Sequence, residues 1–75
     1  MSSDYRRKAR DLASHLQHLG YFVAASNRGH WRVSDSKSGR AGQIPMTPSD
    51  WRSVLNCRAK LARLFNDPRI KKWSP

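Results

Sequence analysis

The sequence contains no glutamate, and its acidic side chains are five aspartates. They are opposed by 15 lysines and arginines, so the 75-residue chain has a formal net charge of +10. Such an excess for this length is typical of proteins that bind polyanions, and we expect nucleic acid as the partner. The alternative is an ordinary solvated surface. A membrane-surface role is disfavoured, because it requires exposed bulky apolar residues that this chain needs for its core.

Cysteine pairs and long apolar segments are also missing. The single cysteine, Cys57, excludes an internal disulfide and lacks the partners for a zinc site, which fits a reducing compartment. No apolar run approaches the roughly 20 residues of a membrane-spanning helix, and the polar N-terminus does not resemble a signal peptide. We therefore expect a cytoplasmic protein with no membrane partner.

The short length limits the chain to one small domain. A chain of this size buries only about 60% of its unfolded surface, so function is expected on a surface or in a shallow groove. We assign residues 1–67 to this domain and residues 68–75 to a basic C-terminal tail that is loosely packed or disordered. In that tail Trp73 is a candidate for stacking on a base.

The apolar spacing of a helix appears first near the N-terminus. Leu12, Leu16 and Leu19 recur at intervals of four and three, which places them on one helical face. Residues 2–4 offer capping side chains at the start, and Gly20 is a natural terminator.

A second helix is predicted to begin within the Thr-Pro-Ser-Asp motif at residues 47–50. Thr47 is the expected N-cap, Pro48 the first helical residue, and Asp50 lies three residues beyond the cap. Residues 66–68 are expected to end this helix. Its predicted buried face consists of Trp51, Val54, Leu55, Leu61, Ala62 and Phe65.

Three strands are predicted between the helices, over residues 21–26, 30–34 and 43–46. Residues 27–29 form the first turn, because Asn and Gly tolerate a positive φ. Pro45 cannot donate to a ladder, so the third strand is expected at an edge. We predict an α+β fold in the order α-β-β-β-α. It has a three-stranded antiparallel sheet with both helices packed on one face.

Strand alternation in residues 30–34 determines which side chains reach the open face of this sheet. It points Trp31 and Val33 toward the helices, and it points His30 and Arg32 away from them. A histidine titrates near neutrality, so His30 is a candidate general acid or base. The alternative is that it has no chemical role. Arg28 and Arg32 flank it and are candidate phosphate ligands.

Further candidate phosphate ligands are Lys37 and Arg40 in the predicted loop and Arg6 and Arg7 near the N-terminus. The N-terminal cations crowd the first turns of the first helix, where the helix dipole disfavours positive charge. This placement suggests a role other than helix stability, although a solvated face is the alternative. No metal site is expected, because His15 and His18 have no third ligand at a readable spacing.

Several short motifs, in their joint order, resemble the HicA mRNA interferase toxins of bacterial toxin–antitoxin systems. The family has a double-stranded-RNA-binding-domain-like fold with the element order predicted above. The likeness covers roughly residues 9–64. The motifs are Leu19-Gly20-Tyr21, Gly29-His30, Ile44-Pro45, Thr47-Pro48-Ser49-Asp50 and Val54-Leu55. The Gly-His-Trp-Arg-Val segment at residues 29–33 is also similar to a segment of basic actinobacterial and phage proteins.

The resemblance implies a metal-independent endoribonuclease that cleaves mRNA with one histidine, here His30, and that uses no cofactor. Its implied partners are RNA and an antitoxin. The alternative is a non-catalytic module, such as a small phage protein, that keeps the fold and binds nucleic acid or a host protein. We expect a monomer or a weak homodimer paired through the edge strand near Ile44.

Overall fold

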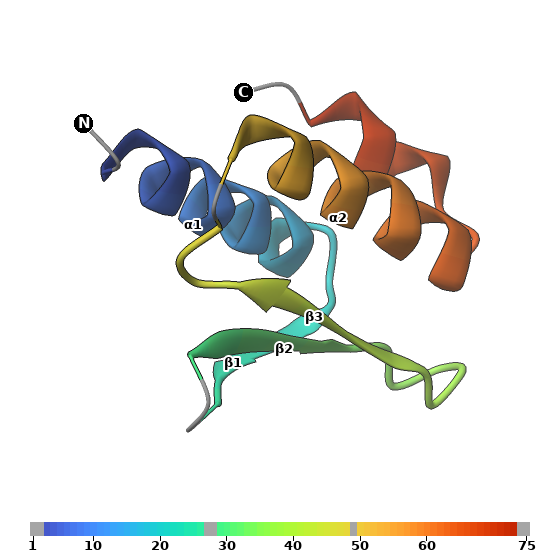
Figure 1. Cartoon of the computed structure of the whole chain (residues 1–75). Helices are drawn as coiled ribbons and strands as arrows, with labels where there is room; N and C mark the ends of the chain where they lie inside the picture. The colour runs from blue at the N-terminus through green and yellow to red at the C-terminus, as the bar shows by residue number, and fades with distance from the viewer. Residues whose placement is uncertain (1–2, 27–28, 49, 74–75) are drawn as a thin grey trace.

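Two helices lie on one face of a three-stranded sheet in the computed structural model (Figure 1), which describes residues 3–26, 29–48 and 50–73. This confirms the predicted α+β fold and its element order. The elements are α1 (Ser3–His18), β1 (Phe22–Ala25), β2 (His30–Ser34), β3 (Ala41–Pro45), α2 (Trp51–Leu64) and the 3-10 helix η1 (Pro68–Lys72). Among the described residues, no helix is long and apolar enough to cross a membrane.

The sheet is an antiparallel meander in the order β1-β2-β3, so β3 is an edge strand as predicted. His30 lies opposite Pro45, and Met46 N–H donates to the Gly29 carbonyl at 3.0 Å. Since backbone groups alternate along a strand, those of Pro45 point away from β2. The missing N–H of proline therefore costs no ladder bond.

The core lies between the sheet and the helices. Val33 and Ile44 are almost fully buried on the inner face of the sheet, and the predicted alternation of β2 holds at Val33 and at the exposed Arg32. Burial of each such aliphatic side chain stabilises the fold by about 1.5–3 kcal/mol. The most deeply buried residues from the helices are Ala9, Leu12, Leu16, Val54, Leu61 and Ile70.

Close packing of α2 on β3 depends on Gly42. A Cβ atom at this position would lie 2.6 Å from Leu61 Cδ2 and 3.0 Å from Leu64 Cδ2. Because any side chain would push these leucines away, the glycine allows α2 to lie directly against the edge strand.

Both long helices end in the same local geometry. Gly20 has a φ of +105°, and Tyr21 N–H donates to the Leu16 carbonyl at 3.1 Å, as in a Schellman motif. The predicted role of Gly20 is thus confirmed. At the end of α2, Asn66 takes the left-handed position with a φ of 51°.

The predicted start of α2 is wrong. The helix begins at Trp51 with Asp50 as its N-cap, and Asp50 Oδ1 accepts from Ser53 N–H at 2.8 Å. The carboxylate also accepts from the Ser53 hydroxyl at 2.9 Å. Met46 N–H still donates to the Gly29 carbonyl, directly before β2. The chain can therefore turn toward the helix only after Met46, which delays the helix start. The side chain of Trp51 lies outside the described residues, and its predicted core position is not tested.

The prediction of a loose C-terminal tail is also wrong as far as Trp73. Residues Pro68–Lys72 form η1, with Ile70 fully buried and Trp73 8% exposed. The Trp73 carbonyl accepts from Arg58 Nη1 at 2.9 Å. Because Trp73 contributes to the core, its indole is not available to stack on a base.

Candidate nucleic-acid interface

His30 begins β2 at the sheet end where Pro45 completes β3. Its side chain is half-buried and lines a groove of about 640 Å³ between β3 and α2. Gln43 and Pro45 form the strand side of this groove, together with Gly42. The structure therefore places the candidate acid or base at an accessible hollow and not in the core.

The helix side of the groove comes from one face of α2. Cys57, Lys60, Leu61 and Leu64 follow one another at the i, i+3, i+4, i+7 spacing, which aligns them along the helix. Leu61 and Leu64 are the leucines that contact Gly42. The floor of the groove is therefore apolar.

Cys57 shares the groove with His30, which raises the possibility of a cysteine nucleophile. Its Sγ atom lies 3.9 Å from the Gln43 carbonyl oxygen. Burial raises the pKa of the Cys57 thiol, so the neutral form predominates near neutrality. Because the thiolate is the nucleophilic form, the environment of Cys57 does not favour that chemistry.

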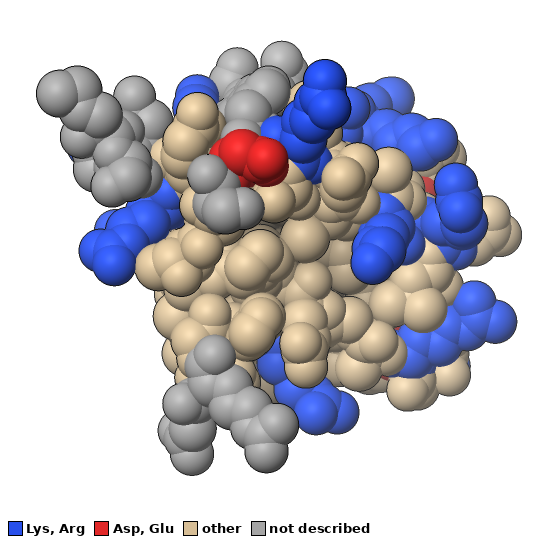
Figure 2. Space-filling view, viewed as in Figure 1, with Lys and Arg blue, Asp and Glu red and all other residues tan. Residues whose placement is uncertain are grey.

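Positive charge borders the groove. Lys60 and Arg63 belong to its lining, and none of the described residues that line it is acidic. Figure 2 shows this side of the molecule, with lysine and arginine side chains, and an acidic side chain at the upper edge, around an uncharged central area. The arrangement suits a ligand with an anionic backbone and apolar faces.

A second hollow extends the groove toward the β2–β3 loop. Arg63 and Leu64 line both, and Arg40 lines the extension. Arg40 Nη1 donates to the Leu64 carbonyl at 2.8 Å, which fixes the loop end against α2. We call the surface formed by His30, Lys60, Arg63 and Arg40 the basic groove.

The other sequence-predicted ligands are spread over the molecule. Arg32 is exposed on the open face of the sheet, opposite Gln43. Lys37 is exposed in the β2–β3 turn, where its backbone N–H donates to Asp35 Oδ1 at 3.1 Å. That bond lowers the pKa of Asp35. Arg28 lies outside the described residues.

Arg6 and Arg7 belong to a different surface. Both are exposed on α1, and Arg6 lines a hollow that does not include His30. Conversely, the sequence interpretation missed Lys60 and Arg63 as site residues. In the sequence, their i, i+3 spacing next to Cys57 and Leu64 places them along one side of the helix. The sequence does not show that this side faces β3, which the fold does.

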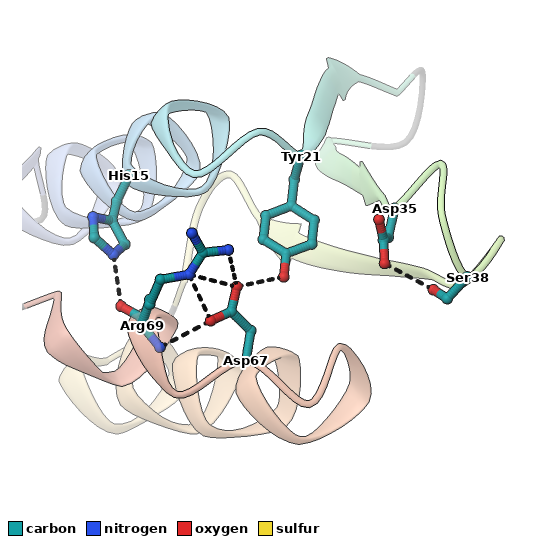
Figure 3. A network of polar contacts seen from close by, with 6 residues as sticks. All are labelled: His15, Tyr21, Asp35, Ser38, Asp67 and Arg69. Atoms are coloured by element: carbon teal, nitrogen blue, oxygen red, sulfur yellow. Dashed lines mark hydrogen bonds and ion pairs between the residues drawn. The ribbon is translucent and has the colours of Figure 1, made fainter.

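The remaining titratable cluster is structural (Figure 3). Asp67 Oδ2 accepts from the Tyr21 hydroxyl at 2.7 Å and from Arg69 Nη2 at 2.8 Å. The Arg69 guanidinium holds the pKa of Asp67 well below its usual range. Burial and the bond to Asp67 raise the pKa of Tyr21 to about 12. These contacts join the start of β1 to η1.

The two histidines of α1, His15 and His18, have different surroundings. His15 Nε2 lies 3.1 Å from the Arg69 carbonyl oxygen, and His18 is exposed. Within the described ranges, no three histidine, cysteine or aspartate side chains gather as metal ligands would.

No protein-family model, curated protein or solved structure matches the chain.

Proposed function

We propose that the protein binds single-stranded RNA through the basic groove. The observation that carries the proposal is the position of His30 in an apolar-floored groove that Lys60 and Arg63 border and that no described acidic residue lines. Lysine and arginine attract phosphates, whereas an apolar floor accommodates unpaired bases. The net charge of +10 and the resemblance to HicA toxins support the same assignment.

Replacement of the two cations that line the groove provides the first test. We expect Lys60→Gln/Arg63→Gln to weaken binding of a labelled single-stranded RNA by about tenfold or more, since each lost phosphate contact removes charge-assisted bonding. Lys71→Gln/Lys72→Gln is the matched control, because it removes the same charge from exposed residues of η1. Fluorescence anisotropy measures both affinities. Equal losses would contradict a localised site and indicate attraction by net charge alone.

Cleavage of the bound RNA is a second candidate function, favoured by the presence of His30 in the same groove. In this reaction an imidazole nitrogen of His30 accepts the proton of a ribose 2′-hydroxyl. The oxygen then attacks the adjacent phosphorus, and the bond from phosphorus to the 5′-oxygen breaks. That oxygen takes a proton from the imidazolium or from water, which leaves a 2′,3′-cyclic phosphate and a 5′-hydroxyl. Lys60 and Arg63 would offset the charge that develops on phosphorus.

The cleavage assay uses RNA in EDTA with wild type, His30→Ala and the control His18→Ala, an exposed histidine of α1. Loss of general-base catalysis typically costs about 10²–10⁴-fold, so His30→Ala should fall to background while His18→Ala retains activity. Circular dichroism checks that both variants fold. RNA binding without cleavage by wild type would support the non-catalytic module instead. The cytoplasm, where mRNA is available, is the proposed compartment for either function.

A further inference from the structure

A separate hollow of about 360 Å³ lies between α1 and the end of the sheet. It is lined by Arg6 and Arg10 from α1, by Trp31 from β2, and by Met46 and Thr47 from the segment after β3. Arg6 and Arg10 are one helical turn apart and exposed, so both guanidinium groups project on one side of α1. Among the residues whose side chains the structure describes, none that lines this hollow is acidic.

Trp31 provides the aromatic surface of this hollow. It lies on the helix-covered face of the sheet and packs against the core, but it is half-buried and not fully enclosed. The part of the residue that the core leaves accessible borders the hollow beside Met46. A rigid indole is a favourable platform for a nucleic-acid base, whose face stacks on it regardless of sequence.

The charge on α1 needs an explanation other than helix stability. Arg6 lies in the first turn, where the positive end of the helix dipole disfavours a cation, and Arg7, Lys8 and Arg10 add further positive charge directly after it. A phosphate held by Arg6 and Arg10 would relieve this repulsion. Two guanidinium groups beside an aromatic ring match a nucleotide, which carries phosphate and base together.

The hollow adjoins the basic groove along the chain. Pro45 lines the basic groove and Met46 lines the hollow, and consecutive Cα atoms are only about 3.8 Å apart. In the same way, His30 lines the basic groove and its neighbour Trp31 lines the hollow. Because neighbouring residues of a strand point to opposite faces of the sheet, an RNA strand that occupies both sites would have to pass around the end of β3.

We propose that this hollow is a nucleotide subsite, in which the base stacks on Trp31 and the phosphate contacts Arg6 and Arg10. The subsite rests on the proposed RNA binding and extends it to a second, stacking contact. It differs from the basic groove in chemistry, because aromatic stacking and paired guanidinium groups replace an aliphatic floor and a histidine.

The test is an NMR titration of the full chain with 5′-AMP, and separately with inorganic phosphate. The indole Nε1–H signal of Trp31, assigned with Trp31→Phe, is the readout. We expect 5′-AMP to shift this signal and phosphate at the same concentration to shift it much less. Arg6→Gln/Arg10→Gln should weaken 5′-AMP binding by about tenfold, whereas Lys71→Gln/Lys72→Gln should leave it unchanged.

Equal shifts with 5′-AMP and phosphate, or unchanged 5′-AMP affinity in Arg6→Gln/Arg10→Gln, would overturn the subsite. The basic groove is tested independently, since Lys60→Gln/Arg63→Gln should bind 5′-AMP at Trp31 as wild type does. If that variant also keeps full RNA affinity, the basic groove fails and the subsite stands. If it loses RNA affinity while 5′-AMP leaves Trp31 unshifted, the subsite fails and the basic groove stands.

Discussion

At the scale of single residues, Gly42 determines whether the basic groove can form. Its missing side chain lets Leu61 and Leu64 approach β3, and those leucines provide the apolar floor. The same residue therefore serves both the core and the candidate site. Substitutions at position 42 should change stability and groove shape together, because Leu61 and Leu64 must shift to admit a side chain and both line the groove.

We expect Gly42→Val to lower the free energy of unfolding by about 1–3 kcal/mol, the usual cost of overpacking. The physical reason is the 2.6 Å approach of any Cβ atom to Leu61 Cδ2. Urea denaturation measures the change. Ala41→Val is the control, since Ala41 is exposed on the neighbouring strand position. Equal stability of the two variants would show that α2 does not press on Gly42.

Asp67 gives a second prediction at the residue scale. Its folded pKa is lowered chiefly by Arg69, whereas an unfolded aspartate titrates near pH 3.9. The carboxylate therefore contributes stability that is present above about pH 4 and is lost as the pH falls toward the folded pKa. We expect Asp67→Asn to be about 1–3 kcal/mol less stable than wild type at neutral pH.

The stability difference between wild type and Asp67→Asn should shrink below about pH 4, because the Asp67 carboxyl of the unfolded wild-type chain then binds a proton while that of the folded protein stays ionised. Chemical denaturation over a pH series measures it. Asp11→Asn, at an exposed position of α1, is the control and should follow wild type. A difference that stays constant down to pH 2 would argue against the Arg69 ion pair as its source.

At the scale of elements, local sequence signals predicted the helices and strands but not the packing of the C-terminal segment. Leucine spacing identified α1, and Pro45 identified the edge strand. The packing of η1 was missed because the local sequence there is dominated by cations. Its anchors are Ile70 and the Tyr21–Asp67 bond, which joins residues 46 positions apart. Such long-range partners leave no periodic pattern.

The start of α2 is another element-scale error, and its correction is testable. We expect Asp50→Ala to destabilise the protein by about 1 kcal/mol, since the carboxylate satisfies Ser53 N–H at the helix start. Thr47→Ala should have little effect, because Thr47 is exposed and precedes the helix. Thermal unfolding of both variants measures the order of the effects. A larger loss for Thr47→Ala would restore the original N-cap assignment.

At the scale of the whole molecule, the candidate site depends on long-range assembly. The sequence predicted His30 and the basic character, but the groove arises only when α2 is laid along β3. Lys60 and Arg63 then join His30 from an element about 30 residues further along the chain. Arg6, in contrast, was grouped with His30 by charge alone, and the fold places it at another hollow.

The response of RNA affinity to salt distinguishes a defined groove from the general attraction of a chain with net charge +10. For single strands, the slope of log affinity against log salt is about −0.7 per phosphate contact. Lys60→Gln/Arg63→Gln should therefore make the slope shallower by about 1.4, if each cation contacts one phosphate. Lys71→Gln/Lys72→Gln removes equal charge and should leave the slope near that of wild type. Fluorescence anisotropy between 50 and 300 mM salt, about the range in which such contacts screen, measures both slopes. Because counterion release counts contacts and not net charge, equal slopes in the two variants would contradict phosphate binding by Lys60 and Arg63.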